Sequence, residues 1–278
     1  MDLIKEPTYV KKFRCSNRWC SDTCCHGFDI ELDDMSVEVY NSFTGKLKEL
    51  IKKGLVQKND RIYIKSEEDG CVFLNANNLC ELQMVGGESA LCYTCRTYPR
   101  FHIMRDNINF TGLSLSCPTA YFLIINAGES TYPFYSLEDN QIIARQSALI
   151  ENEYFLIEEV VELFGNLDKR EFDFDDCFSL ITLKSAVVKN TLSKIETLNL
   201  CRYFYFRYQE GKAWENISYW FIALISVLME SKTITRNEIY KLAKEIEHSE
   251  RNINFLNMNF TQYKTRIDDL KEFLTKED

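Results

Sequence analysis

The sequence is poor in glycine, proline and histidine, with 10 Gly, 4 Pro and 3 His among 278 residues. No glycine-rich turn follows an apolar strand pattern, which excludes the doubly wound fold that binds nucleotide cofactors through such a turn. The histidines, His26, His102 and His248, give no Ser/His/Asp arrangement. Pro133 is the last proline, so helices after it are not interrupted by proline.

Long apolar runs are also absent. The best candidate, residues 220–229 (WFIALISVLM), has ten residues, about half of what a membrane helix requires. The first residues, MDLIKEPTYVKKFRC, lack the apolar centre of a secretory signal. We therefore expect a cytoplasmic protein with no membrane partner. The apolar fraction of 45% and the charged fraction of 27% are typical of a globular chain and exclude disorder.

A basic face is missing as well, because the net charge is −9 and most of it lies in the second half. Residues 1–120 contain 15 Lys and Arg against 16 Asp and Glu, whereas residues 121–278 contain 18 against 26. We therefore expect no nucleic-acid partner, since nucleic-acid binding needs a basic surface. An acidic surface can attract a lysine-bearing partner, but it is more commonly only a solvated surface.

Cysteine, in contrast, is abundant and clustered, with nine of the eleven cysteines between residues 15 and 117. Because the cytosol is reducing, the clustering favours metal ligation over disulfides. The predicted metal ligands are Cys15, Cys20, Cys24, Cys25, Cys71, Cys80, Cys92, Cys95 and Cys117. Cys177 and Cys201 fit small buried hydrophobic residues instead.

Thiol ligands at these spacings indicate either zinc or an iron–sulfur cluster. The nine thiols suffice for two four-sulfur sites, or for one site with spare structural thiols. The Cys-x3-Cys-x2-Cys pattern of radical-generating iron–sulfur enzymes is not present, because Cys25 follows Cys24 directly and position 27 is Gly. Only Cys92-x2-Cys95 matches a zinc-ribbon knuckle. His26 is either a further ligand or a hydrogen-bond donor to one.

Several residues near the cysteines are candidates for binding a cofactor or for acid–base chemistry. Arg96, Tyr98 and Arg100, in the motif CRTYPR, can pair with a carboxylate of a cofactor or substrate, or form ordinary salt bridges. Asp29 and Glu31 are candidate bases by position alone, and exposed loop carboxylates are the simpler interpretation. The aromatic run 202–208 fits either a methylammonium cage or, as we favour, a buried helix.

Apolar periodicity predicts an α+β fold that is mostly α. We expect a cysteine-rich metal-binding module with short β-hairpins over residues 1–127, followed by a helical bundle over residues 128–278. Alternation of apolar and polar residues predicts a strand at 60–66, a hairpin at 71–83 and another strand or hairpin at 102–115. Helical spacing predicts helices at 34–53, 118–126, 141–164, 178–209, 213–230, 235–247 and 260–275.

Four motifs, in order, resemble the cysteine-rich domain of the flagellin lysine-N-methylase family. They are FRC-x4-C-x3-CCHGF, CVFL…LCEL, CRTYPR and SLSCPTA. The wider group is a zinc- or iron-chelating family with a CxxCxxCC signature. The first cysteine cluster of this chain, which consists of Cys15, Cys20, Cys24 and Cys25, is spaced more widely than that signature. The resemblance covers residues 7–125.

The resemblance implies an enzyme, a protein-lysine N-methyltransferase. It implies that S-adenosylmethionine is the methyl donor, that flagellin or another lysine-bearing protein is the substrate, and that an iron–sulfur cluster, [4Fe–4S] rather than zinc, is the metal group. The alternative is a non-catalytic zinc- or iron-chelating module that acts as a binding scaffold or an electron carrier.

Overall fold

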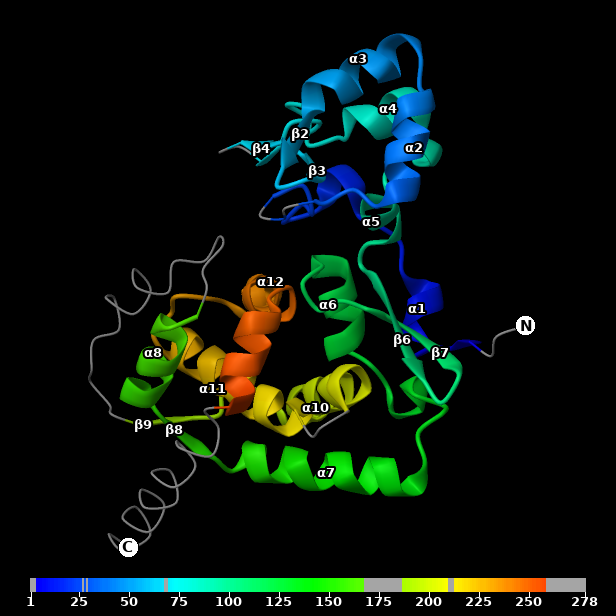
Figure 1. Cartoon of the computed structure of the whole chain (residues 1–278). Helices are drawn as coiled ribbons and strands as arrows, with labels where there is room; N and C mark the ends of the chain where they lie inside the picture. The colour runs from blue at the N-terminus through cyan, green and yellow to red at the C-terminus, as the bar shows by residue number, and fades with distance from the viewer. Residues whose placement is uncertain are drawn as a thin grey trace, which may run out of the picture.

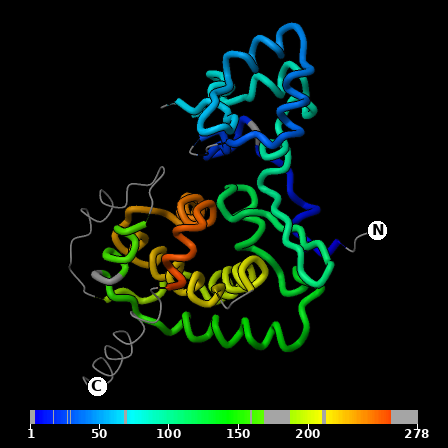
Figure 2. The backbone as a smooth tube through the Cα atoms, viewed as in Figure 1, coloured from blue at the N-terminus to red at the C-terminus, as the bar shows by residue number. Residues whose placement is uncertain are grey.

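The computed structural model describes residues 4–26, 28, 30–67, 70–167, 187–209 and 213–258, and their secondary structure confirms the predicted α+β, mostly α class. Helices and short strand pairs form two lobes of unequal size (Figure 1). Figure 2 follows the chain out of the larger lobe after helix α1 (Tyr9–Lys12) and back into it through strand β6 (Arg100–Arg105). The smaller lobe is therefore inserted into the larger one.

The smaller lobe packs short helices on short hairpins. Its elements are α2 (Asp34–Ser42), α3 (Gly45–Gly54), β2 (Leu55–Lys58), β3 (Arg61–Ile64), β4 (Ser66–Glu67), β5 (Gly70–Cys71) and α4 (Glu81–Gly86), followed by α5 (Tyr93–Thr97). β2 pairs with β3 and β4 with β5, both antiparallel. Its core contains Leu32, Tyr40, Ile51, Ile64, Phe73, Leu82, Ala90 and Cys92.

Two predictions for the smaller lobe need correction. The single helix predicted at 34–53 is two helices, because Phe43 and Thr44 are extended and Gly45 has a φ of +59°. The second arm of the hairpin predicted at 71–83 is helix α4 instead of a strand, although the turn forms as expected: the Asn75 side chain accepts hydrogen bonds from the backbone of Asn77 and Leu79. The strand predicted at 60–66 is confirmed as β3.

A three-stranded sheet forms one side of the larger lobe, with the order β1-β7-β6. β1 (Ile4–Lys5) runs parallel to β7 (Ile108–Leu113), and β6 is antiparallel to it, so the strand or hairpin predicted at 102–115 is a hairpin. In this register Phe101 pairs with Gly112. Gly112 leaves space for rings: a Cβ there would lie 2.4 Å from Phe101 and 2.6 Å from Phe206.

The helices of the larger lobe follow the sheet. They are α6 (Pro118–Ile125), α7 (Leu137–Glu151), α8 (Ile157–Gly165), α10 (Lys194–Tyr208), α11 (Ala213–Glu230) and α12 (Ile239–Glu247). The predictions for α6 and α11 are confirmed, and the helix predicted at 235–247 appears as the shorter α12. Of the helix predicted at 178–209, residues 178–186 lie outside the described part, residues 187–189 form a strand instead, and α10 confirms the part over residues 194–208. The helix predicted at 141–164 is wrong, because β8 (Tyr154–Leu156) interrupts it and pairs with β9 (Val187–Lys189). Residues 260–275 lie outside the described part.

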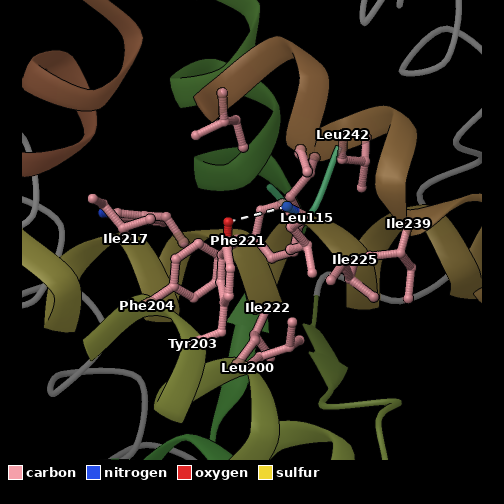
Figure 3. Close-up of a cluster of buried hydrophobic side chains, with 14 of the residues drawn as sticks. Leu115, Leu200, Tyr203, Phe204, Ile217, Phe221, Ile222, Ile225, Ile239 and Leu242 are labelled. Atoms are coloured by element: carbon pink, nitrogen blue, oxygen red, sulfur yellow. Dashed lines mark hydrogen bonds between the residues drawn. The ribbon is translucent and has the colours of Figure 1, made fainter. Parts of the chain in front are cut away.

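The core of the larger lobe is built around α10 and α11 (Figure 3). The aromatic run at 202–208 belongs to this core, since residues 203–206 are buried, which confirms the interpretation as a packed helix. Figure 3 also shows the hydroxyl of Tyr203 accepting a hydrogen bond from the backbone N–H of Leu115 at 3.0 Å. Among the helices in the described ranges, none combines the length and apolar character that crossing a membrane requires.

The larger core includes residues from both sides of the domain boundary predicted at 127/128. Phe13, Leu113 and Leu115 pack in the same core as the residues of α10 and α11. The boundary itself stays a prediction. The two hydrophobic cores divide instead between residues 32–92 and the chain on both sides of them.

Candidate functional site

A cavity of about 370 Å³ lies where the chain passes between the two lobes. The residues that line it include eight of the nine predicted metal ligands: Cys15, Cys20, Cys24, Cys25, Cys71, Cys80, Cys95 and Cys117. The ninth, Cys92, is hydrogen-bonded to Cys95, which does line the cavity. The cysteines form four groups along the sequence: the first cluster (residues 15–25), the pair Cys71 and Cys80, the pair Cys92 and Cys95, and Cys117 alone. The fold brings all four groups to one place.

Three of these cysteines are N-cap residues of helices: Cys80 precedes α4, Cys92 precedes α5 and Cys117 precedes α6. Unpaired backbone N–H groups at a helix start favour the thiolate. For Cys117, however, burial raises the pKa to about 11 despite hydrogen bonds from the backbone of Ala120 and Thr119. At Cys117 the effect of burial on the pKa therefore outweighs the effect of the helix start.

Hydrogen bonds between thiols join the first cluster to β5. The pKa of Cys25 is lowered to about 3, mainly by its hydrogen bond with Cys24 and next by its hydrogen bond with Cys71. The same two hydrogen bonds raise the pKa values of Cys24 and Cys71 well above their usual range. The backbone N–H of Cys71 also donates to the carbonyl of Cys25 at 2.7 Å. In a second pair, the hydrogen bond with Cys95 lowers the pKa of Cys92 to about 7. Within each group, one thiol is thus stabilised as a thiolate by its neighbours.

Metal ligation by these thiols stays a prediction. Over the residues with described positions, no group of three or more His, Cys, Asp or Glu side chains is arranged so that it could hold a metal ion. The chemistry of the donors does fit zinc or an iron–sulfur cluster, because both are bound by cysteine thiolates. The cavity that eight of the nine thiols line supports the predicted ligands as one set.

The three predicted cofactor-binding residues, Arg96, Tyr98 and Arg100, all line the same cavity. The hydroxyl of Tyr98 lies 3.1 Å from Oγ of Ser116, and burial raises its pKa well above the usual value. The guanidinium of Arg100 lies over the ring of Phe13, 5.2 Å from its centroid. Their role in binding a cofactor stays a prediction, but their placement beside the cysteines is shown.

The cavity also has charged residues that the sequence reasoning did not select. Arg14 and Lys65 add two cations to the arginines of CRTYPR, and Asp22 and Glu88 are the carboxylates of the lining. Cations therefore exceed carboxylates at the cavity, although the chain carries a net charge of −9. Arg14 is signalled by its position next to Cys15. Lys65 follows β3 and has no sequence signal.

One candidate base is engaged elsewhere. The carboxylate of Glu31 accepts hydrogen bonds from Arg61 at 2.7 Å and from the hydroxyl of Tyr63 at 3.0 Å. Arg61 is exposed, and Glu31 is absent from the cavity lining. Glu31 is therefore a partly exposed carboxylate, paired with Arg61 outside the cavity. Asp29 lies outside the described residues.

Comparison with known proteins finds relatives over 130 aligned residues, 44% of this chain. The chain is 34% identical to the flagellar biosynthetic protein FliU of Salmonella muenchen, of which the match covers 77%. It is 33% identical to proteins named lysine-N-methylase from Salmonella typhimurium and Salmonella choleraesuis. The match spans about a third of these two proteins, 32% of each. No protein-family model and no solved structure matches the chain.

Proposed function

Because the chain belongs to the flagellin lysine-N-methylase family, we propose that it transfers methyl groups from S-adenosylmethionine to lysine side chains of a protein, with flagellin as the expected substrate. The observation that carries the proposal is the identity of 33% with two proteins named lysine-N-methylase. The cavity that gathers the family's cysteine motifs supports it independently.

The thiols that line the cavity are the proposed ligands of an iron–sulfur cluster, [4Fe–4S] in preference to zinc. Such a cluster would be held by thiolates from three of the four cysteine groups, and it would supply a binding point for the amino-acid end of S-adenosylmethionine. Thiolates bring negative charge to the cavity, and Arg14, Lys65, Arg96 and Arg100 offset it.

The arginines of CRTYPR have a second proposed task. A guanidinium forms paired hydrogen bonds with a carboxylate, so Arg96 and Arg100 can hold the carboxylate of S-adenosylmethionine. The hydroxyl of Tyr98 is already paired with Ser116, which fixes the ring in the cavity wall. A substrate lysine must lose its proton before it accepts a methyl group, so the reaction also needs a base or a path for that proton.

The decisive experiment is mass spectrometry of flagellin that is co-expressed with and without this protein. Added methyl groups on lysine that appear only with the protein support the proposal. Unmodified lysines, with S-adenosylmethionine present and the protein folded, contradict it. The same experiment with Arg100→Ala tests the role of the cavity, and Arg61→Ala is the matched control because Arg61 is an exposed arginine paired with Glu31.

Binding of the methyl donor and of the metal can be measured separately. Protein purified without oxygen should be brown, with absorbance at about 400 nm, if it holds an iron–sulfur cluster. Colourless protein that contains zinc contradicts the cluster. Calorimetric titration of the metal-loaded protein with S-adenosylmethionine should show binding that Arg100→Ala weakens and Arg61→Ala leaves unchanged.

The match covers only 32% of each lysine-N-methylase, and this favours a second candidate function without methyl transfer. The matched region then acts as a metal-binding module, either a zinc-stabilised binding scaffold or an iron–sulfur electron carrier. In this case the purified protein holds metal but binds no S-adenosylmethionine. That combination separates the two functions without knowledge of the substrate.

A further inference from the structure

We propose that helix α12 is the positioning element of the first cysteine cluster. Tyr240, Lys244 and His248 are spaced by four residues, so they form one stripe along α12 and its C-cap. All three contact the segment 21–28, which contains Cys24 and Cys25. In Figure 1, α12 lies beside α6 on the side of the larger lobe that faces the smaller lobe.

The strongest of these contacts is a buried ion pair. Nζ of Lys244 lies 2.6 Å from the carboxylate of Asp22, and the two side chains are only 4% and 13% exposed. The same ammonium group lies 5.5 Å from the ring centroid of Phe28, within the range of a cation–π contact. One turn earlier, the hydroxyl of Tyr240 lies 3.2 Å from Oγ of Ser21. Side chains on both sides of Asp22 are therefore fixed to α12.

His248 extends the stripe to a second cysteine group. Its ring packs edge-on against Phe28 with centroids 4.7 Å apart. Its Nε2 lies 2.8 Å from Oγ of Ser116, the residue before Cys117, and this hydroxyl is also within hydrogen-bond distance of Tyr98. The imidazole thus joins the first cluster, the start of α6 and the tyrosine of CRTYPR.

The cysteines of the smaller lobe have a different support. Cys92 is buried in the smaller core, and Cys71, Cys80 and Cys95 pack against it. The first cluster is not part of that core. The hydrogen bonds of Cys25 with Cys71 join it to β5, and the contacts of residues 21–28 join it to α12, near the opposite end of the chain. The inference that α12 keeps these thiols in place for a metal rests on the proposed metal site. The inference that α12 orders residues 21–28 does not depend on a metal.

The test compares Lys244→Met with Lys241→Met in the full-length protein. Lys241 is the matched control, because it lies on the same helix but pairs with Glu238 at the surface. Hydrogen exchange followed by mass spectrometry should show that Lys244→Met accelerates backbone exchange in residues 15–28 by about tenfold or more, since it leaves a buried carboxylate without its partner. Residues 80–97 should be unchanged in both variants. Release of metal to a chelator should be accelerated by Lys244→Met only.

Equal exchange of residues 15–28 in the two variants would overturn the proposal. If Lys244→Met does not fold, Tyr240→Phe decides, because it removes only one hydroxyl: faster exchange of the segment supports the proposal, and unchanged exchange overturns it. If the wild-type protein holds no metal, the proposed metal site is contradicted, but the comparison of hydrogen exchange still tests the role of α12. The two failures are therefore distinguishable.

Discussion

Replacing Glu247 by alanine should destabilise the larger lobe more than any change to an exposed ion pair. The carboxylate of Glu247, at the end of α12, is 0% exposed and has three partners. It accepts hydrogen bonds from the hydroxyl of Tyr203 at 2.6 Å and from that of Ser114 at 2.9 Å. It also pairs with Arg207 at 3.3 Å, and that arginine side chain is only 13% exposed.

The expected cost follows from what the substitution leaves behind. Without Glu247, the guanidinium of Arg207 remains in the core beside the ring of Phe101, 4.4 Å from its centroid, and no other carboxylate among the described residues forms an ion pair with it. Removing one partner of a buried ion pair costs about 3–5 kcal/mol. For a chain of this length, each kcal/mol lost from the free energy of unfolding lowers the melting temperature by about 2 °C. We therefore expect the melting temperature to decrease by about 6–10 °C.

The assay is urea unfolding followed by tryptophan fluorescence. Trp214 and Trp220 are buried in the larger core, so their emission reports on this lobe. Trp19 is 79% exposed and should be replaced by phenylalanine in all variants. The control is Lys194→Ala, which breaks a pair at 3.8 Å whose lysine is 81% exposed and should cost less than about 0.5 kcal/mol.

A loss of less than about 1 kcal/mol for Glu247→Ala would refute the reasoning, because the buried arginine would then tolerate the missing partner. The double substitution Arg207→Met with Glu247→Leu removes both charges together. It should be more stable than Glu247→Ala, since no buried charge is left unpaired.

Three further outcomes are expected. Gly112→Ala should destabilise the protein by about 1–3 kcal/mol in urea unfolding, because its methyl group meets two rings, whereas Gly128→Ala, with open space around the Cβ, should be neutral within about 1 kcal/mol. Cys25→Ser should reduce the metal content measured by elemental analysis, whereas Cys201→Ser should not, because Cys201 is a fully buried residue of the larger core. Calorimetric titration with S-adenosylmethionine should show at least about fivefold weaker binding to Arg100→Ala, the loss of one charged hydrogen bond.

Local patterns in the sequence predicted the elements whose ends are marked by local chemistry. The Asp33 side chain caps α2 by accepting a hydrogen bond from the backbone N–H of Ser36, and Pro118 starts α6. The breaks within predicted helices were missed, because apolar periodicity continues across them. At 154–156 the chain forms β8, and its partner β9 lies about 30 residues later, a pairing that no local pattern reveals.

The candidate site shows the same division. The order of the cysteine motifs was enough to predict that the thiols act together, and eight of them do line one cavity. It was not enough to predict that Cys24, Cys25 and Cys71 form one hydrogen-bonded row, or that burial raises the pKa of Cys117. Lys244 was invisible because its partner, Asp22, comes from the opposite end of the chain. Long-range packing decides these features.

The insertion of the smaller lobe sets an order of events during protein synthesis. The hydroxyls of Tyr9 and Tyr132 lie 3.3 Å apart in the fold but 123 residues apart in the sequence, so α1 leaves the ribosome long before its partners exist. The residues of the smaller core, from Leu32 to Cys92, are complete by then. On a growing chain, the smaller lobe can therefore form first. The contact of α1 with Tyr132 and the contacts of the first cysteine cluster with α12 form only after those later residues have been translated.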